Sequence, residues 1–521
     1  MKRLLLYPSL LASFLMSEPI HAQDPGSLDT DFGELGRVFT EFASWSDAEA
    51  MHILPDDRIL IAGHTTDGAA SYGGLIARYL PDGELDESFG FQGSVQVALG
   101  GLFTTFRDIT VLDDGKILVA GHTNVNERNH MLVARFHDDG QLDGSFGTNG
   151  VSLLSVSPTS GQDGYAIAVD AEGRILLVGS CHIDGIPFGV VARLDADGAL
   201  DMSFGDAGYA VPDITAEGLI PTVRFRSVLV QPDGKIVAAG YFGTPLNFSG
   251  WVARFLDDGS PDTAFGDGGN SIIFEPGFSH MFFDAKVTTD GEIVIGGNYV
   301  GMDGTVYLLM RLQPDGNVDQ NFGINGYSAV APFLGSSQGR TIMLSGGGDP
   351  SILIGGSSGD NFSIMMATSS GFIDTDFGTD GLSVDYSASH QRDQIMCIAR
   401  QSNGKLVAAG YRFDQNLQQR SVALLRYNFE STLDTRSIAA DDIGMQVYPN
   451  PGTGHYSIIL PDGFTAKDLQ LFAANGQMAG SYTPASAIET RLDLSHLPKG
   501  LYHLVASDAT GKVLRCKVVK M

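Results

Sequence analysis

Short apolar runs of four to seven residues recur along most of the chain, and Gly, Asp and Pro bound each of them. One such run is Lys116–Gly121, and another is Met131–Phe136, which ends in Ala-Arg-Phe. Runs of this length that are rich in β-branched and aliphatic residues predict β-strands. Asp-Gly pairs between consecutive runs, as at Asp114-Gly115, predict tight hairpin turns because such turns need positive φ. The pattern therefore predicts an all-β chain.

A repeated motif, Leu-Asp-x-x-Phe-Gly-x-x-Gly, organises these runs. Its Asp stands at positions 29, 86, 143, 201, 262, 319, 374 and 434, so the spacing is 55 to 61 residues and the chain holds seven units. Its Phe recurs as Phe32, Phe89, Phe146, Phe204, Phe265, Phe322 and Phe377. Four antiparallel strands per unit at a nearly constant period predict a seven-bladed β-propeller over residues 28–434.

The motif is expected to connect one blade to the next, from rim to axis, with its Phe wedged between blades. The last copy, Leu433-Asp434, lacks Phe-Gly, which predicts that the ring closes there with Phe32 and Gly33 already in place. An Arg precedes the motif in six units and is expected to pair with the motif Asp in its own blade. These arginines are Arg78, Arg135, Arg193, Arg254, Arg311 and Arg426, whereas the sixth unit has Met366. A functional ring of cations is the alternative.

Composition indicates where the protein is exported and argues against nucleic acid as a partner. The formal charge of −29 falls within the first 440 residues, and such an acidic body repels nucleic acid. Residues 1–22 are predicted to be a signal peptide, with Lys2 and Arg3 before an apolar stretch and Ala22 at its end. No later segment has 18 apolar residues, so no transmembrane segment is expected. The three cysteines, Cys181, Cys397 and Cys516, do not form a disulfide framework.

The last part of the chain has a different pattern. A polar linker over 435–443 leads to residues 444–521, where alternating apolar positions and turn residues predict a small β-sandwich. Its motifs are Tyr448-Pro449-Asn450-Pro451, Asn475-Gly476, the segment Leu497-Pro498 with Gly500 and Tyr502, and a basic end that includes Lys517 and Lys520.

Both parts resemble known families. The seven motif copies resemble the delta-60 repeats of bacteria over about Leu28 to Asp434, which implies the architecture and no particular chemistry. The ordered motifs of the tail are similar to the type A C-terminal sorting domain of the type IX secretion system of Bacteroidota. That resemblance implies recognition of the tail by the type IX secretion machinery, often followed by its removal. The protein is therefore expected to be secreted, or attached to the outer-membrane surface, after passage through the periplasm.

A candidate binding surface follows from the pattern of variation between units. Strand alternation places the nearly constant Asp-Gly turns on one face and the variable loops on the other. The residue that follows the last Gly of the third run varies between units: it is His64, His122, Ser180, Tyr241, Asn298, Ser357 and Tyr411. Varied polar and aromatic residues on a constant scaffold are typical of a binding face, and unconstrained loops are the alternative. Joint substitution of His64, His122, Tyr241 and Tyr411 is predicted to abolish ligand binding.

Metal sites and catalysis have less support. His64 and His122 lack an identified third ligand, so no metal site is predicted. Asp-rich turns at Asp29-x-Asp31, Asp195-x-Asp197 and Asp374-x-Asp376 lack the full calcium loop, so no cofactor is expected and calcium stays an alternative. No serine nucleophile elbow, HExxH or Walker motif is present, which favours a protein without catalytic activity.

The leading functional hypothesis is an exported module that binds an extracellular glycan or protein. An extracellular hydrolase or lyase with its site near the propeller axis, and a repeat scaffold without a small ligand, are the alternatives. Carboxylates or histidines that converge at the axis would favour the enzyme, and small or apolar residues there would favour binding.

Overall fold

The computed structural model consists of strands and turns, and its described residues contain no helix. It describes residues 24–520 apart from 68–71, 100, 102, 158–159, 184–185, 213–221, 245–246, 302–303, 331–335, 347–349, 387–391, 430–445, 449–453, 461–465, 474–477, 483–488 and 509–512. The predicted signal peptide and the predicted linker 435–443 lie outside these residues. The chain divides into two compact units, Met1–Thr432 and Leu433–Met521. Among the described residues there is no helix long and apolar enough to span a membrane.

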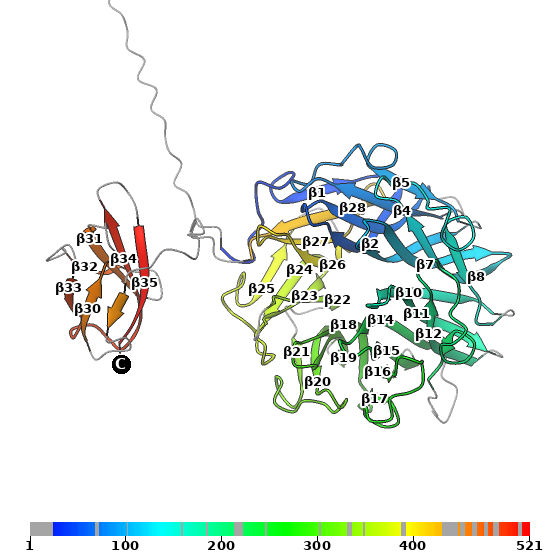
Figure 1. The fold of residues 1–521 in the computed structure, drawn as a ribbon. Helices are drawn as coiled ribbons and strands as arrows, with labels where there is room; N and C mark the ends of the chain where they lie inside the picture. Colours follow the sequence, from blue (N-terminus) through cyan, green and yellow to red (C-terminus); the bar gives the residue numbers. More distant parts are fainter. Residues whose placement is uncertain are drawn as a thin grey trace, which may run out of the picture. The chain divides into compact units, whose positions relative to one another are not determined.

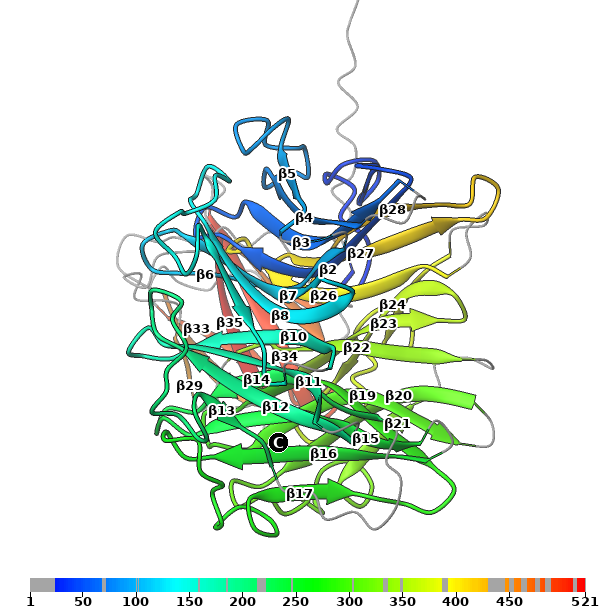
Figure 2. The same ribbon diagram turned by 90° about the vertical axis from the view of Figure 1, so that its right-hand side faces the viewer.

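The first unit is a ring of antiparallel four-stranded sheets (Figures 1 and 2). The innermost strands are β2 (Trp45–Ile53), β6 (Thr104–Val111), β10 (Gln162–Val169), β14 (Thr222–Val230), β18 (Ser279–Val287), β22 (Ser337–Leu344) and β26 (Gln394–Arg400). The second strands are β3 (Ile59–Thr66), β7 (Ile117–Val125), β11 (Ile175–Ile183), β15 (Ile236–Thr244), β19 (Ile293–Gly301), β23 (Ile352–Ser358) and β27 (Leu406–Asp414).

The two outer positions complete each blade. The third strands are β4 (Tyr72–Tyr79), β8 (Arg128–Phe136), β12 (Ile186–Leu194), β16 (Asn247–Phe255), β20 (Gly304–Leu312), β24 (Asn361–Ala367) and β28 (Gln419–Tyr427). The outermost strands are β5 (Ser94–Val97), β9 (Val151–Leu154), β13 (Tyr209–Ala210), β17 (Asn270–Ile273), β21 (Tyr327–Val330), β25 (Leu382–Asp385) and β1 (Arg37–Thr40). Neighbouring innermost strands contact one another all around the ring, including β26 with β2. The predicted seven-bladed, all-β propeller is therefore confirmed.

The predicted boundary between blades was wrong. The motif was expected to connect one blade to the next, but the strand that follows it, β5, pairs with β4 and is the outermost strand of the same blade. The Leu-Asp-x-x-Phe-Gly motif thus joins the third strand to the fourth strand within one blade, rather than rim to axis between blades. A periodic sequence defines the length of the repeat but not its starting point, and only strand pairing decides that.

Closure of the ring follows the prediction made from the missing last Phe-Gly pair. The N-terminal strand β1 pairs antiparallel with β28, from Arg37 opposite Leu425 to Thr40 opposite Val422. The first and last segments of the propeller therefore build the seventh blade together. A single parallel bridge, from Trp45 to Arg420, also joins β28 to β2 of the first blade.

The motif phenylalanines lie between neighbouring blades, as predicted. Phe89 belongs to a buried cluster that combines Leu60 and Ile76 of the first blade with Val119 and Leu132 of the second. All seven motif phenylalanines are fully buried, and each belongs to a different interblade cluster. Burial of one such side chain contributes about 1.5–3 kcal/mol to the free energy of unfolding, so the seven side chains together stabilise the contacts between blades.

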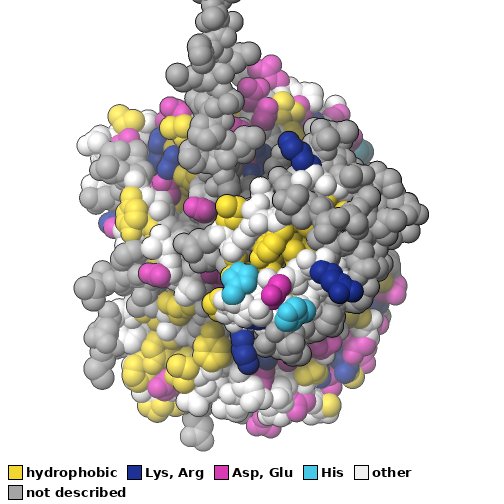
Figure 3. All heavy atoms as spheres, turned by 90° about the vertical axis from the view of Figure 1, so that its left-hand side faces the viewer, with side chains coloured by type: hydrophobic (Ala, Val, Ile, Leu, Met, Phe, Trp, Pro, Cys, Tyr) yellow, Lys and Arg dark blue, Asp and Glu magenta, His cyan; other side chains and the backbone are white. Residues whose placement is uncertain are grey.

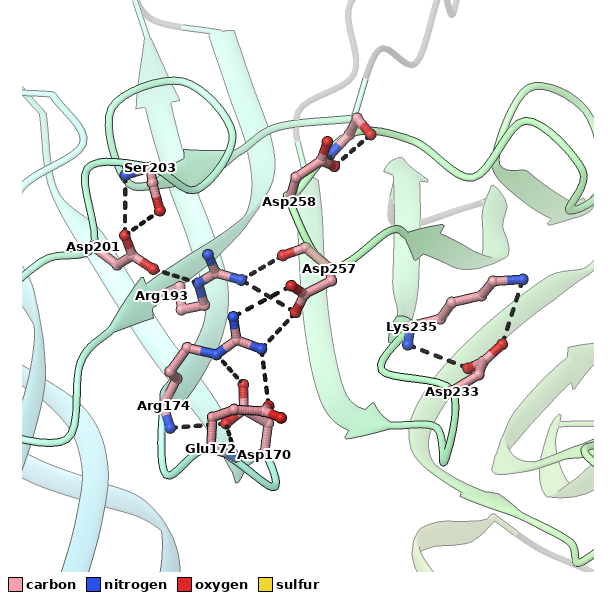
Figure 4. A network of polar contacts seen from close by, with 11 residues as sticks. Asp170, Glu172, Arg174, Arg193, Asp201, Ser203, Asp233, Lys235, Asp257 and Asp258 are labelled. Carbon is pink, nitrogen blue, oxygen red and sulfur yellow. Dashed lines mark hydrogen bonds and ion pairs between the residues drawn. The ribbon is translucent and has the colours of Figure 1, made fainter.

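The arginine before each motif clamps two blades together, as Arg193 shows (Figure 4). Its Nε donates to Asp201 Oδ2 at 2.7 Å, its Nη1 donates to the backbone oxygen of Asp257 in the next blade, and its Cζ lies 4.5 Å from the centre of the Phe204 ring. The same Arg-to-Asp ion pair, with N–O distances of 2.6 to 2.8 Å, joins Arg78 to Asp86, Arg135 to Asp143, Arg254 to Asp262, Arg311 to Asp319 and Arg426 to Asp29. The predicted pairing within the blade is confirmed, so these arginines are structural.

The sixth blade offers a test of this clamp because Met366 stands at the arginine position. The Asp374 N–H donates to the Met366 carbonyl at 2.9 Å, the same distance as between Asp86 and Arg78. We expect Met366→Arg to raise the free energy of unfolding by about 1 kcal/mol, through a half-buried ion pair with Asp374. Denaturant unfolding measures this change, and Met202→Arg at a site that is 66% exposed is the control. An equal effect of both substitutions would contradict the clamp.

The second unit is a small β-sandwich. One sheet contains β29 (Gln446–Tyr448), β30 (His455–Ile459) and β33 (Glu489–Asp493), and the other contains β31 (Ala466–Ala473), β32 (Met478–Tyr482), β34 (Gly500–Asp508) and β35 (Val513–Lys520). Ile458 and Leu492 of the first sheet share a buried core with Leu471, Leu504 and Val518 of the second. The predicted sandwich is therefore confirmed.

Two residues of the tail motifs tie the sandwich together. The Tyr502 hydroxyl donates to the Pro498 carbonyl at 2.8 Å, and Lys520 Nζ donates to the Ser495 carbonyl at 3.0 Å. Pro449, Asn450 and Pro451 lie outside the described residues, as do the side chains of Tyr448 and Lys517. Elsewhere on this unit, His455 Nε2 lies 3.6 Å from Asp493 Oδ1 on an exposed surface, and Figure 3 shows histidine side chains close to an acidic one.

Candidate functional site

Each innermost strand carries a β-bulge at the same place. The register between β2 and β3 shifts between Ala48 and Ala50, so Glu49 has no partner on β3. The other six innermost strands skip one residue in the same way. A bulge re-aims one side chain and is common beside functional sites. The skipped residues are Glu49, Arg107, Tyr165, Arg226, Phe283, Arg340 and Met396, and we call them the axial ring.

A glycine on the second strand makes room for each bulge. A Cβ atom on Gly63 would lie 1.8 Å from the Asp47 carbonyl oxygen, and one on Gly121 would lie 1.9 Å from that of Thr105. The corresponding distances for Gly179, Gly240, Gly297, Gly356 and Gly410 are 1.8 to 2.0 Å. The glycine that recurs in every unit is therefore required by the bulge that builds the axial ring.

The axial ring borders a cavity of about 350 Å³ that all seven innermost strands line. The ring carries three arginines, one glutamate, two aromatic side chains and a methionine. The next residue on each strand also lines the cavity, and Asp108, Asp284 and Cys397 are among these residues. Lys286 adds a fourth cation to the lining. The axis therefore differs from both sequence-based expectations, since it is neither apolar nor lined mainly by carboxylates and histidines.

Arginine dominates the electrostatics of the ring. Glu49 Oε1 accepts from Arg107 Nη1, and its side chain is 9% exposed. Burial would raise the pKa of Glu49, but Arg107, His64, Arg226 and Arg340 outweigh burial and hold that pKa below its usual value. Glu49 is thus held as an anion among cations.

Aromatic rings separate the remaining guanidinium groups. Arg226 Cζ lies 4.4 Å from the centre of the Tyr165 ring and 5.4 Å from that of Phe283. Arg340 Cζ lies 4.7 Å from the centre of the Phe283 ring, and its Nη2 donates to Gln338 Oε1 at 2.8 Å. Such cation–π contacts stabilise half-buried arginines without neutralising their charge.

The two aspartates beside the ring are engaged by backbone groups. Asp108 accepts the N–H groups of Ile109 and of Ile167 in the next blade, each at 2.8 Å. Burial raises the pKa of Asp108 to about 6, against these hydrogen bonds. Asp284 similarly accepts the N–H of Ala285 at 2.8 Å and that of Ile342, in the next blade, at 3.0 Å. Both carboxyl groups therefore join neighbouring blades.

The residues predicted as a variable face lie inside the second strands rather than in loops. These strands were expected to end at the glycine, but pairing continues beyond it, for example to Thr66 in β3 and Val125 in β7. The placement in loops was therefore wrong. The physical reason is that the glycine is needed to make room for the bulge on the neighbouring strand, so it does not mark the end of its own strand.

Two of these residues contact the axial ring, and two others contact charged residues outside the ring. His64 Nδ1 lies 4.0 Å from Glu49 Oε1, and the Tyr241 ring centre lies 5.7 Å from that of Phe283. Arg420 Cζ lies 4.3 Å from the centre of the Tyr411 ring, and His122 Nδ1 lies 3.8 Å from Asp163 Oδ1. Burial lowers the pKa of both histidines.

The other three predicted residues are buried within or between blades. Asn298 Oδ1 accepts the N–H of Gly339 in the next blade at 2.7 Å, and Ser357 Oγ donates to Gln394 Oε1 at 3.4 Å. Ser180 is 8% exposed. Their role as ligand contacts stays a prediction.

One cluster has the composition of a metal site. Asp47, Glu49 and His64 each present a ligand-type atom, and these atoms lie within 4.8 Å of one another. Arg420 Nη1 lies 2.6 Å from Asp47 Oδ2, and Arg107 contacts Glu49, so a cation would have to compete with two guanidinium groups. The donor set therefore fits an arginine network better than a divalent metal ion.

The turns considered for calcium use their carboxylates locally. Asp195 Oδ1 accepts the N–H groups of Asp197 and Ala199 at 3.0 and 2.8 Å, and Asp374 Oδ1 accepts that of Asp376 at 3.2 Å. Asp29 pairs with Arg426. Calcium binding at these turns stays a prediction.

Sequence reasoning missed the axial ring, although a signal for it exists. In six units the ring residue stands fourteen positions before the recurring glycine, as Arg107 does before Gly121, and in the sixth unit sixteen positions before it. The types at that position vary from Glu to Arg, Tyr, Phe and Met. A recurring glycine that is preceded at a nearly fixed spacing by a residue of varying type is thus the sequence pattern that indicates this site.

These features define a β-propeller protein with a C-terminal sandwich, and comparison with protein families agrees. Residues 54–89, 112–146, 171–204, 231–265, 288–322 and 401–436 match the family described as "Domain of unknown function (DUF5122) beta-propeller". Residues 446–520 match the "Secretion system C-terminal sorting domain". The chain therefore carries DUF5122 β-propeller repeats and a type IX sorting tail, which directs it to the cell surface or beyond. The matched segments leave out the sixth repeat, where Met366 replaces arginine.

No curated protein matches the chain. The WD40 domain of SCAP from fission yeast is similar at 8% identity with a TM-score of 0.23, over 81% of this chain and 95% of that one. Dimeric latent PorU from Porphyromonas gingivalis is similar at 11% identity with a TM-score of 0.12, over 68% of this chain and 32% of that one. The resemblance to delta-60 repeats and the assignment to Bacteroidota stay predictions.

Proposed function

We propose that this exported propeller protein is a binding module that holds an extracellular ligand in the axial cavity. The observation that carries the proposal is the axial ring, because seven bulges at one level present seven side chains of five types to one cavity. Ligand sites are concave and combine apolar walls with a few placed polar groups. Tyr165, Phe283 and Met396 supply apolar surface here, and the arginines and Glu49 supply polar groups.

A saccharide suits this cavity better than a protein segment. A cavity of about 350 Å³ within a ring of strands accommodates one or two sugar units but not an extended chain with its side chains. An exported protein also meets saccharides outside the cell. The binding of a protein partner to the outer faces of the propeller is the alternative form of this function.

A hydrolase or lyase is the second candidate because of one observation. Glu49 and Asp108 line the same cavity, and their pKa values are shifted in opposite directions, as in acid–base pairs. Against this, each oxygen of Asp108 already accepts a backbone N–H group, so the carboxyl group has a structural role between two blades. The binding module is therefore the better-supported function.

Blocking the cavity tests the proposal. We expect Met396→Trp to fill part of the cavity without changing its charge and to weaken saccharide binding at least about tenfold. The measurement is binding of the full-length mature protein to an immobilised panel of neutral and acidic mono- and disaccharides. Met202→Trp is the matched control, because the same substitution falls on a side chain that is 66% exposed.

Other results would contradict the proposal. Equal binding by wild type and Met396→Trp would place the ligand elsewhere, and absence of binding across the panel would favour a scaffold without a small ligand. Shortening of a polysaccharide by the wild type, but not by Asp108→Asn, would favour the enzyme.

A further inference from the structure

The charge at the axis has the opposite sign to that of the chain as a whole. The chain carries a formal charge of −29, yet the axial ring holds three arginines and one glutamate. These arginines, Arg107, Arg226 and Arg340, come from β6, β14 and β22, so three separate blades direct cations to one cavity. Buried cations normally meet an equal number of anions, because an unpaired buried charge is costly.

Two of the three guanidinium groups lack an anionic partner. Among the described residues, no carboxylate lies within ion-pair distance of Arg226 or Arg340, and their contacts are the Tyr165 and Phe283 rings and the Gln338 amide. The Nε atoms of Arg107 and Arg340 are buried without a hydrogen-bond partner. The site therefore has more donors than the protein itself uses.

The nearby acids reduce this imbalance without removing it. Glu49 is paired with Arg107 and Asp284 with Lys286 at 2.8 Å, and Asp108 accepts backbone N–H groups from its own and the neighbouring blade. The cavity lining thus holds four cations and three carboxyl groups, and none of these carboxyl groups is paired with Arg226 or Arg340. Burial and then the charge of Arg226 lower the pKa of Arg340, as expected for like charges held close together. An added anion between these arginines would remove that repulsion.

We propose that the axial ring is a binding site for an oxyanion, namely a carboxylate, sulfate or phosphate group. The inference rests on the proposed function and specifies its ligand chemistry. Guanidinium groups bind such groups through paired N–H donors, and the half-buried setting strengthens each hydrogen bond. Glu49 limits the affinity of the site by occupying one of the three arginines. The anion is either a free inorganic ion or the acidic group of a sugar.

Titration of the full-length mature protein tests the proposal. Isothermal titration calorimetry at constant ionic strength would use sodium sulfate, sodium phosphate and sodium glucuronate, with glucose as the neutral match for glucuronate. We expect saturable binding of at least one anion and none of glucose. Tighter binding of glucuronate than of sulfate and phosphate would identify an acidic sugar as the source of the anion, and the reverse would identify an inorganic ion.

Substitutions of opposite expected effect make the test specific. Arg226→Gln and Arg340→Gln should each weaken anion binding about tenfold, whereas Glu49→Gln should strengthen it, because a competing acceptor is lost. Arg128→Gln removes the same charge at an exposed position on β8 and should have no effect. Without anion, Arg226→Gln should unfold at or above the wild-type temperature, since a like-charge contact is relieved, and this outcome separates lost binding from lost folding.

Failure of the inference and failure of the proposed function give different results. Equal anion binding by wild type, Arg226→Gln and Arg340→Gln, or no anion binding at all, would overturn the oxyanion site. Saccharide binding that is sensitive to Met396→Trp but not to the arginine substitutions would overturn the oxyanion site and keep the proposed function. Arginine-dependent sulfate binding without any saccharide binding would keep the oxyanion site and overturn the proposed function.

Discussion

Removal of residues 24–40 is expected to abolish cooperative folding of the propeller. This segment supplies β1, the Asp29 partner of Arg426 at 2.8 Å and the fully buried Phe32 between the seventh and first blades. It also supplies Arg37, whose Nε donates to Asp385 in the sixth blade at 2.7 Å. Loss of the Phe ring alone costs about 3–5 kcal/mol, and whole domains are stable by only about 5–15 kcal/mol. Circular dichroism during guanidinium unfolding measures the result.

Two further variants keep this prediction testable if the truncated chain does not fold. Removal of residues 433–521, a separate compact unit, should leave the unfolding midpoint of the propeller unchanged. The pair Thr40→Cys and Val422→Cys, at opposed positions of β1 and β28, should form a disulfide that raises the midpoint, and a reductant should reverse the gain. A truncated chain that unfolds like the wild type would show that β1 does not close the ring.

Gly121→Ala is expected to destabilise the propeller by about 3 kcal/mol or more, because its Cβ would lie 1.9 Å from a backbone oxygen of the bulged strand. Relief of this clash requires β6 and β7 to move apart, which also shifts Arg107 at the axis. We therefore expect a lower midpoint of denaturant unfolding and, at temperatures where the variant is folded, weaker ligand binding.

Gly144→Ala is the matched control. No heavy atom lies within 4 Å of the Cβ that it would add, and its backbone does not have positive φ. This substitution should leave stability unchanged within about 0.5 kcal/mol. Similar behaviour of the two variants would contradict the role given to the recurring glycine.

The opposed charges of the body and the axis bear on selectivity. A surface dominated by carboxylates repels large polyanions, so an anionic ligand reaches the axial arginines only if it is small or carries few charges. This agrees with the predicted exclusion of nucleic acid and with a cavity of about 350 Å³. Weak salt dependence of saccharide binding would be unexpected, because both effects are electrostatic.

Most of the architecture could be predicted from the sequence because it repeats. Seven copies of the motif indicate the number of blades, the buried phenylalanines and the Arg–Asp pairs. Each copy repeats the same local contacts, so the pattern can be recognised without the structure. The absence of Phe-Gly after Asp434 indicated closure by the N-terminal segment for the same reason. The tail motifs, in order, were enough to predict a sorting sandwich.

Only the tertiary structure decided where each blade begins within the repeat and which residues make up the site. Whether Ser94–Val97 begins or ends a blade depends on pairing with Tyr72–Tyr79, and hydrogen bonds between separate segments carry no local sequence signal. Likewise, Arg107, Arg226 and Arg340 lie far apart in the sequence, and they meet because bulges on three strands turn them toward one axis. The residues that recur in every repeat determine the scaffold, and the residues that differ between repeats form the site. The function of these varied residues becomes visible only in the closed ring, because the ring places them around one cavity.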